Sequence, residues 1–120
     1  MNAIGSLIMV NIDSPDPAAQ AEFYHHVLGW EVTHSSAEYA MISDGTSSVG
    51  FGKIDAYRPP AWPDEEGRKR FHLDFSVDDL DKAEEQCVAL GARRPEFQPG
   101  ETWRVLLDPA GHPFCVCQRS

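Results

Sequence analysis

The sequence predicts an α+β fold in which one supersecondary unit occurs twice. Two passages of the chain repeat with a constant offset of 62 residues and no gap. The residues that match are Asp16 with Asp78, Leu28 with Leu90 and Gly29 with Gly91. A repeat of half the chain length indicates two copies of a unit that cannot bury its apolar face alone. The order of predicted elements agrees, because both halves read as a strand, a helix and three strands (βαβββ).

The chain has 120 residues, which suits a single domain that buries about two thirds of its unfolded surface. We expect this domain to span residues 1–120 and to contain units at 1–53 and 71–120. The segment 54–70 is rich in proline and charged residues and is interpreted as the loop between them. A loop of this length in a small domain is usually functional or mobile.

The first unit opens with an apolar, β-branched run at 5–12, which predicts a strand buried on both faces. Asp16 is a typical helix N-cap, and Pro17 suits the first helical position. Gly29 is typical of the residue that follows a helix. Three short strands are expected after this helix, at 30–35, 39–43 and 47–53.

The second unit begins with strictly alternating residues at 71–76, which predict a strand with one apolar face. Asp78 or Asp79 then caps a helix that ends at Gly91. A tight Asp-Pro-Ala-Gly turn begins at Asp108 and separates the last two strands. The three strands of this half are expected at 93–97, 102–107 and 113–118.

Charge and composition exclude several classes of partner. The net charge of −9 disfavours nucleic acid and anionic membranes, which carry the same sign. No apolar run approaches the roughly 18 residues that span a bilayer, and no basic region precedes an apolar core at the N-terminus, so we expect no secretion signal. Cys115 and Cys117 are poorly spaced for a mutual disulfide. A reducing cytoplasm is the expected compartment.

The paired βαβββ pattern resembles the vicinal oxygen chelate superfamily, which includes glyoxalase I, bleomycin-resistance proteins and extradiol dioxygenases. The motifs that carry the resemblance lie at 13–17, 23–24, 28–30, 72–78, 90–92 and 108–114. The similarity is closest to the small glyoxalase-like branch. It implies a cupped mixed sheet with the helices outside, a small-molecule ligand inside the cup, and a homodimer.

In metal-dependent members of that superfamily, two histidines and two glutamates on the cup floor hold one divalent ion. The resemblance places these histidines at His72 and at Val10, or at Met9 if one residue is gapped. It places the glutamates near Phe51 and on Cys115. Only His72 and Cys115 keep ligand chemistry, whereas catalytic zinc takes three protein ligands and Mg²⁺ or Mn²⁺ prefers carboxylates. We therefore expect no metal and no cofactor, with a divalent metal as the alternative.

His72 is the residue on which the functional prediction depends. Strand alternation puts His72, Asp74 and Ser76 on one face, which we expect to line the cup. Leu73 and Phe75 share the other face and should meet the helix. Three roles are open for the histidine: a hydrogen-bonded structural residue, a binding residue or general base oriented by the neighbouring carboxylate, and a metal ligand.

The other candidate ligand-binding residues are Asp74, Phe51, Trp103 and Cys115. Phe51 and Trp103 would line an apolar cup, and packing in the core is the alternative for each. Cys115 is a small buried hydrophobe by default, and a soft metal ligand or reactive thiolate otherwise. Trp62 is either a lid or dimer contact, or an anchor for the loop.

The remaining histidines are given no role in the site. His25 and His26 are adjacent on the predicted helix, where neighbours do not face each other, so we do not expect a metal pair. His34 and His112 lie near predicted turns and are expected to be solvated.

Three functions are compatible with these residues. The first is a metal-free binding protein of the bleomycin-resistance kind, which holds a small, partly aromatic, neutral or cationic molecule in the cup. The second is an enzyme of the lyase, isomerase or dioxygenase type, with His72 as base or as part of an atypical metal site. The third is a regulatory or interaction domain that has lost the pocket. We prefer the first, as a cytoplasmic homodimer.

Overall fold

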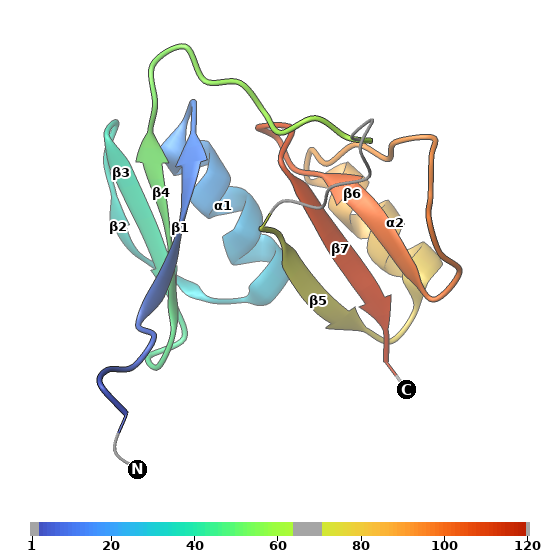
Figure 1. The fold of residues 1–120 in the computed structure, drawn as a ribbon, viewed down its shortest axis with the longest axis horizontal. Helices are drawn as coiled ribbons and strands as arrows, with labels where there is room; N and C mark the ends of the chain where they lie inside the picture. Colours follow the sequence, from blue (N-terminus) through green and yellow to red (C-terminus); the bar gives the residue numbers. More distant parts are fainter. Residues whose placement is uncertain (1–2, 64–70, 120) are drawn as a thin grey trace. The chain divides into compact units, whose positions relative to one another are not determined.

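Each half of the chain folds one helix onto one face of a small β-sheet (Figure 1). The computed structural model describes residues 3–63 and 71–119. The chain divides into two units, Met1–Tyr57 and Arg58–Ser120. The predicted loop at 54–70 is described only as far as residue 63, and its remainder lies outside the described residues. Neither helix in the described ranges is long and apolar enough to cross a membrane.

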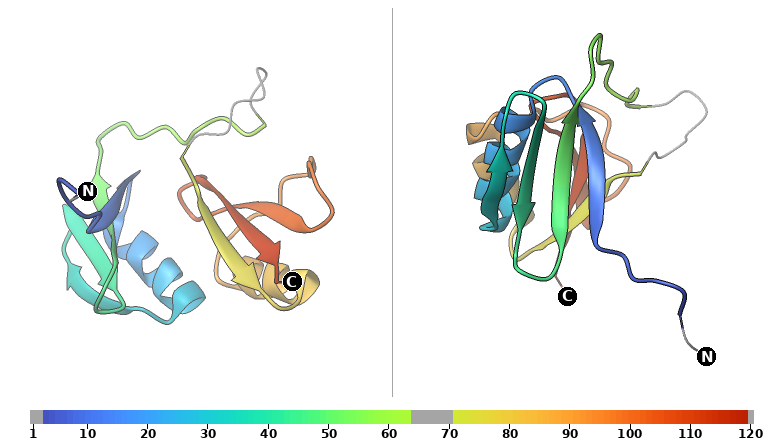
Figure 2. Two further views of the ribbon diagram at one scale, coloured as in Figure 1. Left: turned by 60° about the horizontal axis from the view of Figure 1, so that its bottom comes forward. Right: turned by 90° about the vertical axis from the view of Figure 1, so that its left-hand side faces the viewer.

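The first unit has a four-stranded sheet covered by one helix. Its elements are β1 (Met9–Ser14), α1 (Pro17–Leu28), β2 (Glu31–Ser35), β3 (Tyr39–Ser43) and β4 (Ser48–Lys53). The strand order is β1-β4-β3-β2, with β1 parallel to β4 and the other neighbours antiparallel. Figure 2, right, shows the four strands side by side in this order. This unit therefore has all the elements that the sequence predicts.

The first strand is shorter and more exposed than the sequence predicts. It begins at Met9, and residues 5–8 precede it without strand structure. Within β1 only Ile12 and Ser14 are buried, and they share one face. The prediction of a strand buried on both faces is therefore wrong, because Leu7 and Ile8 lie exposed before β1 and Val10 is exposed within it.

The ends of α1 follow the predicted capping residues. The carboxylate of Asp16 accepts a hydrogen bond from the Ala19 N–H at 3.2 Å, and Pro17 occupies the first helical turn. Gly29 has φ 74° and donates its N–H to the His25 carbonyl at 2.7 Å. A side chain penalises this left-handed conformation, so glycine suits the position.

The second unit repeats the arrangement with one strand fewer. Its elements are β5 (Leu73–Val77), α2 (Leu80–Ala89), β6 (Trp103–Leu107) and β7 (Pro113–Gln118). The strand order is β5-β7-β6, with β5 parallel and β6 antiparallel to β7. Its core includes Leu106, Phe114 and Val116, which are at most 1% exposed. Two small sheets, each with one helix, confirm the predicted α+β class.

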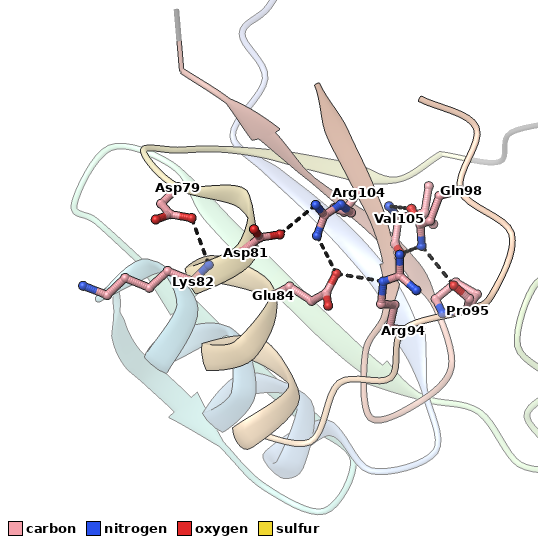
Figure 3. Close-up of polar contacts among 9 residues, drawn as sticks. All are labelled: Asp79, Asp81, Lys82, Glu84, Arg94, Pro95, Gln98, Arg104 and Val105. Atoms are coloured by element: carbon pink, nitrogen blue, oxygen red, sulfur yellow. Dashed lines mark hydrogen bonds and ion pairs between the residues drawn. The ribbon is translucent and has the colours of Figure 1, made fainter. Parts of the chain in front are cut away.

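The strand predicted at 93–97 is reduced to one isolated bridge. Arg93 pairs with the end of β6, and the chain then leaves the sheet. Pro95 has no N–H with which to continue a ladder. The side-chain amide of Gln98 donates to the Val105 carbonyl at 2.9 Å and accepts from the Val105 N–H at 2.8 Å (Figure 3). A side chain therefore satisfies the edge of β6 where a strand was expected.

A network of ion pairs ties α2 to β6 and to the segment before it. The Arg104 guanidinium donates to Asp81 and to Glu84 at 2.8 Å each, and Arg94 donates to the same Glu84 at 2.9 Å (Figure 3). The hydrogen bond to Asp81, followed by that to Glu84, raises the pKa of Arg104. The side chains of Arg104 and Glu84 are each 22% exposed, so water screens this pair less than an open surface pair.

Before the helices, the two units correspond with an offset one residue larger than the offset of the sequence repeat. The N-caps are Asp16 and Asp79, rather than Asp16 and Asp78. The step from the N-cap to the glycine after the helix is one residue shorter in the second unit, from Asp79 to Gly91 against Asp16 to Gly29, which is why the glycines still match without a gap. The residue of the first unit that corresponds to His72 is therefore Met9. The predicted equivalence of His72 with Val10 is wrong, and the gapped alternative holds.

Candidate functional site

The second unit contains a cavity of about 400 Å³ on the face of its sheet opposite the buried core. The residues that line it and bear on its chemistry are Trp62, His72, Asp74, Trp103, Cys115 and Cys117. Pockets for small molecules in proteins typically measure about 300–1,000 Å³ and combine apolar walls with a few polar groups. This cavity has the size and the mixed lining of such a site.

Strand pairing brings the lining side chains together. Asp74 lies opposite Cys115 in the ladder of β5 and β7, and Cys115 lies opposite Val105 in the ladder of β7 and β6. Cys117 lies opposite Trp103. Because side chains alternate across a strand, these five residues share one face. Strand alternation in the sequence predicted that Asp74 lies on this face.

His72 precedes β5 and contacts Asp74. Its Nε2 lies 3.2 Å from Asp74 Oδ1, and the two side chains are 25% and 61% exposed. A carboxylate can only accept a hydrogen bond, so a protonated Nε2 faces Asp74. The contact therefore orients the imidazole ring in the cavity wall.

Burial raises the pKa of the Cys117 thiol, and the nearby Asp74 carboxylate raises it further. The thiolate is the reactive form of cysteine, so Cys117 is a poor nucleophile at neutral pH. Cys87, Cys115 and Cys117 are free thiols. In its thiol form Cys117 contributes a small, largely apolar surface to the cavity.

Asp74→Asn should increase the rate at which Cys117 is alkylated near pH 8. Removing the carboxylate lowers the pKa of the thiol and increases the fraction of thiolate. The rate is measured by peptide mass spectrometry after iodoacetamide treatment, with Cys87 as internal reference, because burial alone raises the pKa of Cys87. An unchanged rate at Cys117 would show that the carboxylate does not act on this thiol.

Two tryptophans form much of the apolar wall. The indole of Trp103 lies against Gly100 so closely that a Cβ at that glycine would overlap the ring. Trp62 is half-buried beside Phe97, with ring centroids 6.3 Å apart. Its indole N–H is buried without an acceptor among the described residues. Trp62 also lines the cavity, and its role as lid, dimer contact or anchor stays a prediction.

Phe51 does not belong to this cavity. It lies on β4 of the first unit, is 0% exposed, and stacks on Tyr24 of α1 with ring centroids 5.6 Å apart and planes 7° apart. The structure thus replaces the predicted ligand-binding role of Phe51 with a place in the core. Alternation around Phe51 does not mark which face of β4 is open, because both of its neighbours, Gly50 and Gly52, lack a side chain.

The structure brings together His72, Asp74, Trp103 and Cys115 from the predicted set. Cys117 was not predicted as a binding residue. The signal was present in the sequence, because a residue two positions from Cys115 on a strand shares its face.

A model of the glyoxalase-like domain matches residues 9–117 of the chain. The chain belongs to the glyoxalase-like domain family. The match extends over both units and confirms the predicted membership of the vicinal oxygen chelate superfamily. No curated protein matches the chain.

Solved structures share the fold of this glyoxalase-like protein. A glyoxalase/bleomycin resistance protein/dioxygenase family enzyme from Burkholderia phytofirmans PsJN is 26% identical, with a TM-score of 0.71 over 95% of this chain and 98% of that chain. A glyoxalase-related enzyme from Fulvimarina pelagi is 19% identical, with a TM-score of 0.68 over 97% and 89%. A fosfomycin resistance protein from Listeria monocytogenes is 14% identical, with a TM-score of 0.71 over 98% and 96%. These likenesses confirm the predicted fold class.

The donor set of this glyoxalase-like protein does not fit the metal site of the metal-dependent superfamily members. Met9 stands where the first histidine is expected, and β4, Ser48–Lys53, contains no carboxylate. An oxygen-rich site for Mg²⁺ or Mn²⁺ is therefore missing its carboxylates. One ligand atom from each of His72, Asp74 and Cys115 does lie within 4.8 Å of the others. This smaller set suits only a softer ion of the zinc class.

Proposed function

We propose that this glyoxalase-like protein binds a small, partly aromatic molecule in the cavity of its second unit, without the usual divalent metal. The observation that carries the proposal is the cavity itself, about 400 Å³ with aromatic walls and few polar groups. Sites that bind small organic molecules typically have this size and this lining.

The lining residues offer a ligand both apolar and polar contacts. Trp62 and Trp103 offer flat apolar surface to a ring. His72 and Asp74 offer one imidazole and one carboxylate, which can orient a ligand that carries hydrogen-bonding groups. The carboxylate favours a neutral or cationic ligand over an anionic one.

Native mass spectrometry of gently purified protein should show a small organic molecule bound to the chain, and elemental analysis should show far less than one metal ion per chain. The expected result follows from an apolar cavity with an incomplete set of metal ligands. About one tightly held Zn²⁺, Ni²⁺, Fe or Mn²⁺ per chain, lost in His72→Ala, would contradict metal-free binding. An empty protein that binds no aromatic compound would contradict the binding function.

The alternative function is an enzyme of the lyase, isomerase or dioxygenase type. The orientation of His72 by Asp74 favours a general base in the cavity wall, and the cluster with Asp74 and Cys115 favours an atypical metal site. Conversion of a bound compound to a product of different mass or connectivity would favour the enzyme. Loss of bound zinc in both His72→Ala and Cys115→Ser would favour the metal site. The homodimer and the cytoplasmic location stay predictions from the resemblance and the composition.

A further inference from the structure

We propose that Glu22, His25 and His26 on α1 form a site for a divalent transition metal of the zinc class. One ligand atom from each of these residues lies within 4.8 Å of the others. None of them lines the cavity of the second unit. The inference is therefore independent of the proposed function.

The spacing of the three residues explains how adjacent histidines serve one site. His25 and His26 follow Glu22 by three and four positions, and both of these positions are neighbours of Glu22 on a helix surface. The two imidazole rings lie with centroids 5.0 Å apart and planes 62° apart. Although adjacent helical residues do not face each other, Glu22 neighbours both histidines, so the three side chains can offer ligand atoms to one ion.

His25 is held in the tautomer that a metal requires. Its Nδ1 contacts the Trp30 carbonyl, which can only accept a hydrogen bond, so Nδ1 carries the proton. The lone pair of the neutral ring is then on Nε2. Histidine ligands of metals usually donate their second nitrogen to a carbonyl or a carboxylate in this way. The left-handed Gly29 turns the chain so that this carbonyl returns to the helix.

The other two residues present their ligand atoms at a suitable spacing. His26 Nε2 lies 3.0 Å from Glu22 Oε1, and the side chains are 49% and 63% exposed. Two ligands of a tetrahedral zinc ion, each bound at about 2.0–2.1 Å, lie about 3.3 Å apart. An ion can therefore replace the Nε2 proton that now lies between these two atoms, with a small side-chain adjustment and release of that proton to water, and water can complete its coordination. The site lies in the last turns of α1, where the helix dipole favours a cation.

The test is calorimetric titration of Zn²⁺ into the full chain carrying His72→Ala. This variant removes a ligand of the other candidate metal cluster, so that binding measured in it reports on α1. We expect one saturable site per chain, weakened at least about tenfold by His26→Gln or Glu22→Gln, because loss of a supporting residue alone costs that much. Co²⁺ should give the visible absorption of a low-coordinate site, lost in the same variants. Both residues are exposed, so circular dichroism should show that the variants stay folded.

The matched controls are His34→Gln and Glu38→Gln, which change an exposed histidine and an exposed glutamate of the same unit. These controls should leave the zinc affinity unchanged. Absence of saturable binding in the His72→Ala chain would overturn the proposal. Equal affinity in His26→Gln, or an equal loss in the controls, would overturn it as well.

Discussion

Phe51→Ala should lower the free energy of unfolding by about 3–5 kcal/mol, the usual cost of removing a buried aromatic ring. Phe51 is 0% exposed and stacks on Tyr24, which is 1% exposed. The substitution therefore leaves a cavity between β4 and α1 that the surrounding core cannot fill. Urea denaturation followed by circular dichroism measures the loss.

The matched control is Phe71→Ala, because Phe71 is 99% exposed. This change should alter the free energy of unfolding by no more than about 0.5 kcal/mol, as surface substitutions usually do. A small stability loss in Phe51→Ala, together with weakened ligand binding, would return Phe51 to the binding role that the sequence suggested.

His72→Ala should weaken binding of the cavity ligand by more than about tenfold and leave the melting temperature within a few degrees, since truncating a group outside the apolar core costs little stability. The side chain is 25% exposed and lies outside the strands, whereas the core of the second unit is formed by residues such as Phe114. Calorimetry with the compound found by native mass spectrometry gives the affinity, and thermal denaturation gives the stability.

The control for this prediction is His34→Ala, which removes an exposed histidine of the first unit. It should change neither the ligand affinity nor the melting temperature. A large stability loss in His72→Ala with the affinity intact would show that His72 is a structural histidine, hydrogen-bonded but without a part in binding.

Local rules made most of the fold predictable from sequence. The cap at Asp16 and the glycine at Gly29 placed α1, because capping depends only on a few neighbouring residues. Alternation along β5 correctly predicted the face of Asp74. Its apolar neighbours Leu73 and Phe75 must face the core, which turns Asp74 to the opposite face. The chain order of the elements then followed the repeat.

The misses arose where a side chain or a distant contact decided the structure. The strand at 93–97 failed because Gln98 occupies the edge of β6, which no strand propensity reports. The face of Phe51 was undetermined because glycines flank it. The contact of His25 with the Trp30 carbonyl was not predictable, because it depends on the turn after α1 bringing that carbonyl back to the helix. Side-chain hydrogen bonds of this kind leave little trace in hydrophobic periodicity.

The contact between Gly100 and Trp103 gives this protein an indirect means of changing its ligand range. Gly100 is not one of the cavity-lining residues, yet any side chain there would displace the indole that forms part of the cavity wall. Gly100 also lies outside the helices and strands, where substitutions disturb no ladder. Selectivity could therefore drift during evolution through a residue that no ligand touches, while every residue in contact with the ligand stayed the same.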